Sequence, residues 1–358
     1  MDQKFLMIII TLGALTIIGL VLGLVLGLKI KDDEDSEVLN SYDNTDELKQ
    51  KYKTIYDTTV NEGIEKRIQN RLLTGFENWN RGFKAWKEWG NILYTPKSIY
   101  NVHGTRLTLE HYQQAMDIAL KQADIIMGDF YNMLIVNNFC AIHYDFKTNG
   151  RSSHVMEFVE FKDIENGISD TRVVEGWGST KDSTYYGTIS FQGSEEKKEQ
   201  EELNNLLLIY QFPSITLDST PTYDQLKSKY LVKYTPDESD TNFAAIFTII
   251  LKGFENWNTD YTHYETWVTE NFDVDATSFS LTEQTRTRTV YLNEIKELFD
   301  EEEIKKLYFD NVLIREYWAA IHYRYRSRDK KSFKVRVGDR MEFFQFNSDL
   351  KIIGNWIQ

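Results

Sequence analysis

The chain has a single cysteine and no excess of positive charge. With Cys140 alone, no intramolecular disulfide can form, so packing has to stabilise the folded state. Lysine and arginine number 41 against 55 aspartates and glutamates, and the formal net charge is -14. Because binding to a phosphate backbone requires a basic surface, we expect no nucleic-acid partner.

Motifs for several kinds of chemistry are also missing. The sequence contains no Gly-rich phosphate loop, no Gly-x-Ser-x-Gly elbow and no Cys/His cluster with zinc spacing. The acidic runs at 32–37 and 300–303 do not resemble a calcium loop. We therefore expect neither a metal nor a cofactor.

What the sequence does contain is a long duplication. Residues 130–146 (FYNMLIVNNFCAIHYDF) return at 309–325 (FDNVLIREYWAAIHYRY), with the string AIHY unchanged. Further landmarks recur in the same order: GFENWN (75–80 and 253–258), MEFVEF and MEFFQF (156–161 and 341–346), and the arms RVVEGW and KIIGNW (172–177 and 351–356). These recurrences predict two tandem copies of one domain.

An apolar segment precedes the repeats. Residues 5–28 carry no charge, and as a helix they would reach roughly 36 Å, enough to span a bilayer. A cleaved signal peptide has a shorter apolar region that ends in small residues, so an uncleaved single-pass anchor in membrane lipid is the better interpretation. Lys4 and Lys29 flank the two ends, so the positive-inside rule does not orient the segment.

Three glycines of this segment fall four residues apart. Gly19, Gly23 and Gly27 form a smooth stripe on the predicted helix, and such a stripe lets two membrane helices pack closely into a homodimer. Glycine is also frequent in membrane helices that do not associate, so that alternative stays open.

The sequence divides into five parts: an anchor (5–28), an acidic tether (29–44), a first domain (45–178), an insertion (179–221) and a second domain (222–358). In each domain, helical apolar spacing comes first and period-two spacing last. We expect three helices per domain, at 46–56, 63–79 and 107–119 and again at 224–234, 243–257 and 291–308, with Thr108 as a cap. Three long strands should follow them.

Segregated helices and strands predict the α+β class with a curved antiparallel sheet in each domain. The insertion has a candidate strand at 185–191 and a charged helix at 195–210. Nothing in the insertion indicates chemistry.

The order of elements resembles the SnoaL-like branch of the nuclear transport factor 2-like superfamily. The resemblance rests on a helix that ends in aromatic-Asn-Trp, on strands like AIHYDF and MEFVEF, and on a last strand ending in tryptophan, and it covers both repeats. It implies two cone-shaped domains, each a bent sheet wrapped on helices around a pocket. It also implies that two copies in one chain can pair through their sheets as an internal pseudo-dimer. The family contains cyclases, isomerases, dehydratases and proteins without catalysis, so fold alone does not imply activity.

The two AIHY strings supply the candidate catalytic residues. Alternate residues of a strand share a face, so His143 and Asp145 should lie together and can form a general-base pair. At the place of Asp145 the second repeat has Arg324, which leaves His322 without the same partner. A histidine that is hydrogen-bonded in the sheet or in a contact between domains is the alternative.

The next strand repeats a carboxylate, Glu157 in one copy and Glu342 in the other. In a suitable register Glu157 would meet His143, and Glu342 would meet His322, as cross-strand pairs.

Aromatic side chains are candidates for lining a ligand pocket, although such residues more often fill a core. The candidates are the repeated tryptophans together with an extra cluster in an aromatic turn of the first repeat: Trp79, Trp177, Trp257 and Trp356, then Trp86, Trp89 and Tyr100. The extra cluster makes the first repeat the better candidate for binding an apolar small molecule.

A basic stretch at 324–340 should form a hairpin in the second repeat. It either contacts anionic lipid headgroups or is a solvated hairpin whose charges prevent edge pairing, and we favour the second interpretation.

We therefore expect a membrane-anchored tandem protein that acts as a small-molecule-binding or protein-assembly module without catalysis. The alternative is a cyclase, isomerase or dehydratase that acts on a hydrophobic carbonyl compound inside a cone. That activity would need an acid or a histidine in a water-poor pocket.

Overall fold

The computed structural model describes residues 45–180 and 221–358, apart from 53, 57, 103–104, 123–124, 149–150, 166–168, 231, 235–236 and 281–284. The expected anchor with Gly19, Gly23 and Gly27, the tether and the elements expected in the insertion lie outside the described residues. Among the helices within those limits, none is both long enough and apolar enough to cross a bilayer.

The first repeat contains four helices and seven strands among its described residues. In chain order they are α2 (Thr45–Lys51), β1 (Thr54–Tyr56), α3 (Ile64–Asn80), α4 (Phe83–Leu93), β2 (Tyr94–Val102), β3 (Thr105–Thr108), α5 (Leu109–Gln122), β4 (Ile125–Val136), β5 (Phe139–Thr148), β6 (Arg151–Glu165) and β7 (Ser169–Thr180).

The second repeat has the same series. Its elements are α8 (Tyr223–Lys229), β8 (Val232–Tyr234), α9 (Phe243–Thr259), α10 (Tyr261–Asn271), β9 (Phe272–Ser280), β10 (Thr285–Thr287), α11 (Arg288–Glu301), β11 (Glu302–Arg315), β12 (Trp318–Asp329), β13 (Val335–Phe346) and β14 (Ile352–Ile357).

Each repeat forms one seven-stranded sheet, and the order of equivalent strands is the same. The first sheet runs β1-β4-β5-β6-β7-β2-β3, and the second, read in the matching direction, runs β8-β11-β12-β13-β14-β9-β10. The α+β class is thus confirmed, whereas a wholly antiparallel sheet was a wrong expectation. Two strands of each sheet are parallel to a neighbour. In the first sheet β1 is parallel to β4 and β2 to β7, and in the second β8 is parallel to β11 and β9 to β14. The meander itself has four strands, β4–β7 or β11–β14, rather than the three expected.

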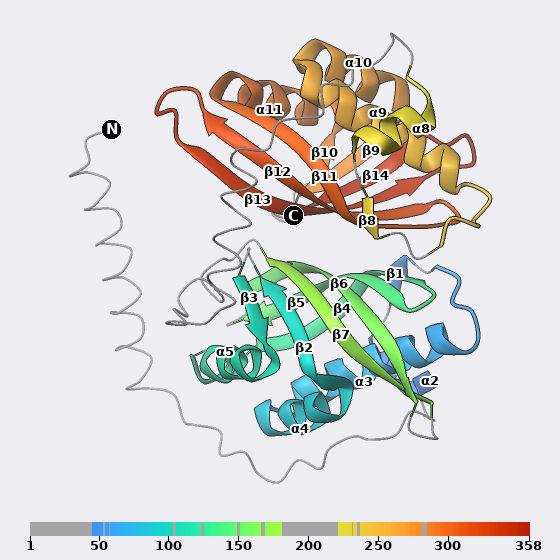
Figure 1. Ribbon diagram of the computed structural model, residues 1–358, viewed down its shortest axis with the longest axis vertical. Helices are drawn as coiled ribbons and strands as arrows, with labels where there is room; N and C mark the ends of the chain where they lie inside the picture. Colours follow the sequence, from blue (N-terminus) through green and yellow to red (C-terminus); the bar gives the residue numbers. More distant parts are fainter. Residues whose placement is uncertain are drawn as a thin grey trace.

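The two sheets face each other, and helices cover their outer sides (Figure 1). Alternate residues of β5 divide accordingly: Cys140, Ile142 and Tyr144 pack under the helices of the first repeat. Phe139 and Ala141 instead pack between the sheets, together with apolar residues of the second repeat. The predicted alternation is confirmed, and both faces of the meander are buried.

One ion pair ties the repeats together at the edge of this contact. Arg315 at the end of β11 donates from Nη1 and Nη2 to the two carboxylate oxygens of Glu65 in α3, at 2.6 and 2.7 Å. Both side chains are buried. Burial alone would raise the pKa of Glu65, but hydrogen bonds from Arg315 and from two backbone N–H groups hold it below its usual value.

The predicted helix at 63–79 is confirmed as α3, and Thr108 caps α5 by accepting the N–H of His111 at 3.3 Å. Other bounds were wrong. The aromatic turn is the helix α4, whose buried Ala85, Trp86, Trp89 and Leu93 follow helical spacing. The helices expected to run to 56 and 308 end at Lys51 and Glu301, and the strands β1 and β11 follow them.

The repeated GFENWN sequence attaches a helix to the sheet. In the second repeat, Trp257 Nε1 donates to the carbonyl of Ile304 at 3.1 Å. Asn258 accepts the N–H of Lys306 and donates to its carbonyl, both at 2.8 Å. The first repeat makes the same bonds from Trp79 and Asn80 to Ile125 and Met127. The motif is therefore structural.

The glycine of this sequence allows a second helix to approach. A Cβ built on Gly75 would lie 2.5 Å from the ring of Trp89, and one on Gly253 would lie 2.5 Å from the ring of Trp267. Only a glycine therefore lets α3 pack on α4, and α9 on α10, at this distance.

We predict that Asn258→Ala lowers the free energy of unfolding by about 1–3 kcal/mol, because it leaves the backbone groups of Lys306 unpaired. Urea denaturation of the whole chain, followed by tryptophan fluorescence, measures the change. Asn256 is the matched control, since its side chain bonds, within the part of the chain that the structure describes, to the carbonyl of Lys252 in its own helix. Equal losses of unfolding free energy in the two alanine variants would contradict a stabilising role for the bonds between Asn258 and Lys306.

Candidate functional site

The two candidate histidines lie between the sheets, away from the cones. His143 is 2% exposed and His322 is fully buried. Each ring packs on an aromatic pair of the other repeat: His143 on Phe343 and Trp356 at 5.9 and 6.4 Å, and His322 on Phe158 and Trp177 at 5.8 and 6.3 Å. These are equivalent residues, so the contact is reciprocal. The recurrence of AIHY thus corresponds to a contact between domains.

His143 bonds to a second histidine. Its Nε2 lies 3.2 Å from Nδ1 of His154, and no hydrogen bond joins it to Asp145 in the described part of the chain. Burial holds the pKa of His143 well below its usual value, and His154 lowers it further. The expected pairing with Glu157 is wrong: Met156 stands opposite His143, so Glu157 points to the other face.

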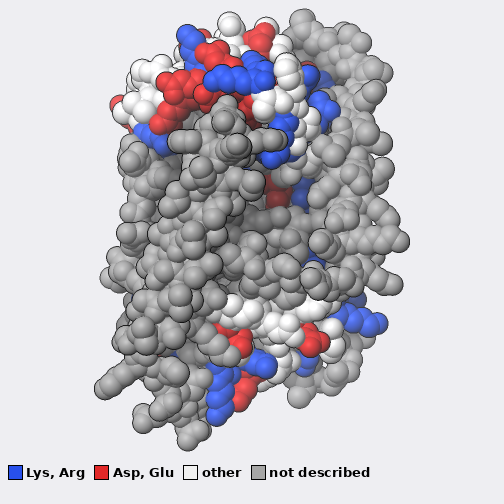
Figure 2. Space-filling view, turned by 90° about the vertical axis from the view of Figure 1, so that its left-hand side faces the viewer, with Lys and Arg blue, Asp and Glu red and all other residues white. Residues whose placement is uncertain are grey.

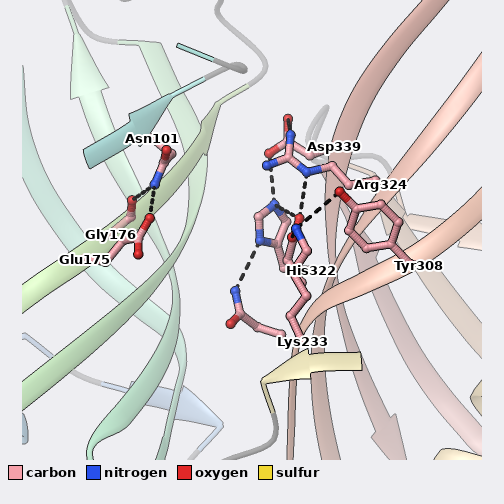
Figure 3. A network of polar contacts seen from close by, with 10 residues as sticks. Asn101, Glu175, Gly176, Lys233, Tyr308, His322, Arg324 and Asp339 are labelled. Carbon is pink, nitrogen blue, oxygen red and sulfur yellow. Dashed lines mark hydrogen bonds and ion pairs between the residues drawn. The ribbon is translucent and has the colours of Figure 1, made fainter. Parts of the chain in front are cut away.

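His322 has acidic partners instead (Figure 3). Its Nε2 lies 2.9 Å from Oδ2 of Asp339, and Met341, not Glu342, stands opposite it in the sheet. Close by, Arg324 Nε and Lys233 Nζ donate to the two oxygens of Asp310, each at 2.6 Å.

Figure 3 also shows Asn101 and Glu175 of the first repeat on the opposite side of the junction. Asn101 Nδ2 donates to Glu175 Oε1 at 2.9 Å. Every charged partner drawn around His322 therefore belongs to an ion pair or a hydrogen bond, as in a structural network.

The predicted pocket aromatics divide between core and interface. Trp79, Trp86, Trp89 and Tyr100 are buried within the core of the first repeat, and Trp257 is buried in that of the second. The cone positions expected for Trp177 and Trp356 were wrong. Both side chains pack between the sheets, because they share the face of Phe158 and Phe343, their cross-strand partners.

The interior of the second cone contains the polar group best suited to chemistry. Tyr323 of β12 donates its hydroxyl to Oε1 of Glu342 at 2.5 Å. Lys306 Nζ lies 3.4 Å from the same oxygen, and the carboxylate is 4% exposed. Tyr264 and Tyr291 hydrogen-bond to each other at 2.8 Å.

Lys306 is held in an aromatic cage. Its ammonium lies 4.6 Å from the ring centroid of Phe254 and 4.9 Å from those of Trp257 and Tyr323. Such contacts stabilise a desolvated cation. Burial nevertheless lowers the pKa of Lys306, and the charge of Glu342 offsets part of that effect.

The first cone retains the tyrosine and the acid but lacks the cation. Tyr144 donates to Glu157 Oε1 at 3.1 Å, and at the place of Lys306 stands Met127. Burial therefore raises the pKa of Glu157, and hydrogen bonds from Tyr100 and Tyr144 lower it only in part.

Little space is left in the second cone. Its cavity has a volume of about 40 Å³, lined among others by Trp257, Tyr291, Lys306, Arg340 and Glu342. That volume holds about one water molecule. Nowhere within the described ranges do three or more His, Cys, Asp or Glu side chains gather as a metal site would require.

The basic hairpin of β12 and β13 is not uniformly solvated. Arg324 is buried, and Arg340 lies over the ring of Tyr325 at 5.1 Å. At the hairpin end, Glu303 stands opposite Arg328, and Lys330 N donates to the carbonyl of Glu301. Figure 2 shows acidic and basic atoms side by side on the described part of this end of the molecule. Acidic residues therefore lie near the basic hairpin.

The sequence indicated Tyr323 and Glu342 as repeated residues, but not as partners, because register decides which side chains meet. Lys306 was missed altogether. Superposing the repeats letter by letter would have found it, since a lysine replaces Met127 at the equivalent position.

Comparisons with known proteins found similar solved structures but no family. It matches no protein-family model and no curated protein. Among solved structures it is similar to a candidate SnoaL-like polyketide cyclase from Jannaschia sp. CCS1, with 12% identity and a TM-score of 0.30 over 35% of this chain and 90% of that one. It is also similar to an NTF2-like protein of unknown function from Exiguobacterium sp. 255-15, with 15% identity and a TM-score of 0.27 over 30% and 95%. The similarity predicted from the sequence is thus found, and it concerns the fold alone.

We predict that the stability of the protein falls as the pH is lowered below about 6.5. The unfolded chain then binds a proton at His143 that the folded chain excludes, so the slope approaches about 1.4 kcal/mol per pH unit. His143→Gln removes this contribution and should flatten the profile. The comparison is His263→Gln, which removes an exposed histidine that is bonded to Asp260 on α10 and leaves the buried His143 in place, so the steep fall due to His143 should persist in urea denaturation at pH 5 to 7. Parallel profiles for all three proteins would refute the assignment.

Proposed function

We propose that the protein is a membrane-anchored tandem module that acts without catalysis, by binding or assembly. In this proposal the two cones are joined through their sheets, and residues 5–28 attach them to a membrane through the acidic tether at 29–44. Gly19, Gly23 and Gly27 give the anchor a surface on which a second chain can pack as a homodimer.

The volume inside the second cone is the observation that carries this proposal. Ligand pockets usually have about 300–1,000 Å³, whereas the cavity beside Glu342 has about 40 Å³. The polar groups around it are paired with one another, and the rings of Trp257 and Tyr323 close over Lys306. A substrate would have to displace these side chains.

The contact between the sheets supports an internal pseudo-dimer. His143 lies on Phe343 and Trp356, while His322 lies on the equivalent Phe158 and Trp177. Reciprocal contacts between equivalent residues are what a two-fold interface requires. In this proposal the duplication supplies both halves of a dimer in one chain.

One observation favours the alternative, an enzyme that acts on a hydrophobic carbonyl compound. Lys306, Glu342 and Tyr323 converge in an apolar cone, and burial lowers the pKa of Lys306. Perturbed ionisable groups of this kind cluster at active sites. A cyclisation, isomerisation or dehydration would use the carboxylate as base and the tyrosine as hydrogen-bond donor.

The two proposals differ in what the second cone binds. We expect no saturable quenching of tryptophan fluorescence and no turnover when the full chain is titrated with cyclic, aromatic and steroid ketones. The control is the double variant Lys306→Met/Glu342→Gln, which removes both partners of the buried pair and should remain folded. Ketone binding or conversion by the wild type that this variant lacks would establish the enzyme instead.

The anchor makes a separate prediction. Deletion of residues 1–30 should move the protein from the membrane fraction to the supernatant after ultracentrifugation, because it removes the apolar segment. The full-length chain with Gly23→Ile is the matched control and should stay in the membrane fraction. A deletion variant that still pellets with membranes would overturn this role.

A further inference from the structure

An open groove lies where the first repeat meets the turn between β11 and β12. Its volume is about 460 Å³, and its lining includes Lys49 of α2, Lys66 of α3, Thr59, Val60 and Glu316. This volume is in the range of small-molecule sites. Glu316 supplies the one carboxylate among the described lining residues, and it already accepts a hydrogen bond from Thr59.

The two lysines of this groove carry charges that no ion pair among the described residues neutralises. Within the described ranges neither ammonium forms an ion pair, whereas nearby Lys51 bonds to Glu77 at 2.6 Å. Burial lowers the pKa of Lys49, and Lys66 lowers it further, against the opposing effect of Asp46 and Glu62. Two half-buried cations that face one space repel each other until an anion lies between them.

The second repeat shows what the same position looks like when it is neutralised. Lys227 is the equivalent of Lys49, and its ammonium donates to both oxygens of Glu238 at 2.6 and 2.8 Å. At the place of Glu238 the first repeat has Val60, and at the place of Ala244 it has Lys66. The first repeat has therefore lost the acid and gained a second base around the same lysine.

We infer that the groove binds a small organic acid, whose carboxylate lies between Lys49 and Lys66 in the place that Glu238 takes beside Lys227. Two ammonium groups supply charge-assisted hydrogen bonds to such a carboxylate. Val60, Leu73 and Met133 provide apolar lining for the body of the ligand. This site goes beyond the proposed function, since it lies outside both cones and does not depend on whether they are catalytic.

The test is a titration of the full chain, in detergent at low ionic strength, with acetate, benzoate and succinate, and with inorganic phosphate for comparison. Ligand-observed NMR measures binding. We expect a carboxylate to bind, and Lys49→Gln or Lys66→Ala to weaken it by about tenfold or more. Lys66→Ala places there the residue that the second repeat already has. Lys227→Gln is the matched control and should leave binding unchanged.

A second variant tests the same site without removing a lysine. Val60→Glu restores the acid of the second repeat, so its carboxylate should pair with Lys49, block the added ligand and leave the melting temperature no lower than that of the wild type. Three outcomes would overturn the inference: no carboxylate binds the wild type, only phosphate binds, or binding survives in the lysine variants and in Val60→Glu.

Discussion

The burial of one sheet face on the other is the contact on which the rest of the structure depends. Because the meander strands have helices on one side and the second sheet on the other, both faces have to be apolar. Phe158 and Phe343 lie on the buried inner faces, and the repeated histidines are hydrogen-bonded there in place of water. The contact also directs both cones outward, which keeps their interiors independent of each other.

The sequence predicted much of this arrangement and failed at identifiable points. Recurrence of AIHY and GFENWN predicted the duplication, and period-two spacing predicted which residues of β5 share a face. Such local patterns encode neither the strand register nor which face of the sheet covers the helices. Glu157 was therefore paired with the wrong residue, and Trp356 was placed in a cone. The helix α4 was missed because its tryptophans were interpreted as a pocket rather than as helical spacing.

The two cones show how one substitution changes the electrostatics of a pair of side chains that both repeats contain. Tyr144 with Glu157 and Tyr323 with Glu342 are equivalent, yet only the second pair has a lysine beside it. Beside Met127, burial raises the pKa of Glu157. Beside Lys306, the carboxylate of Glu342 has a buried cation as its neighbour. The sequence shows the exchange of Met127 for Lys306, but not that the lysine meets Glu342, because that depends on which strand residues point inward.

The ion pair between Glu65 and Arg315 shows what covalent fusion permits. In a dimer of identical chains, every substitution at the interface occurs twice, so its effect on the stability of the interface is doubled. Here the equivalents of Glu65 and Arg315 in the opposite repeats are Phe243 and Val136, so the pair exists once. In a fused interface, one substitution therefore changes one side only, and each substitution alters half as many contacts as it would in a homodimer. Equivalent positions in the two repeats can then acquire different roles while the shared sheet contact persists.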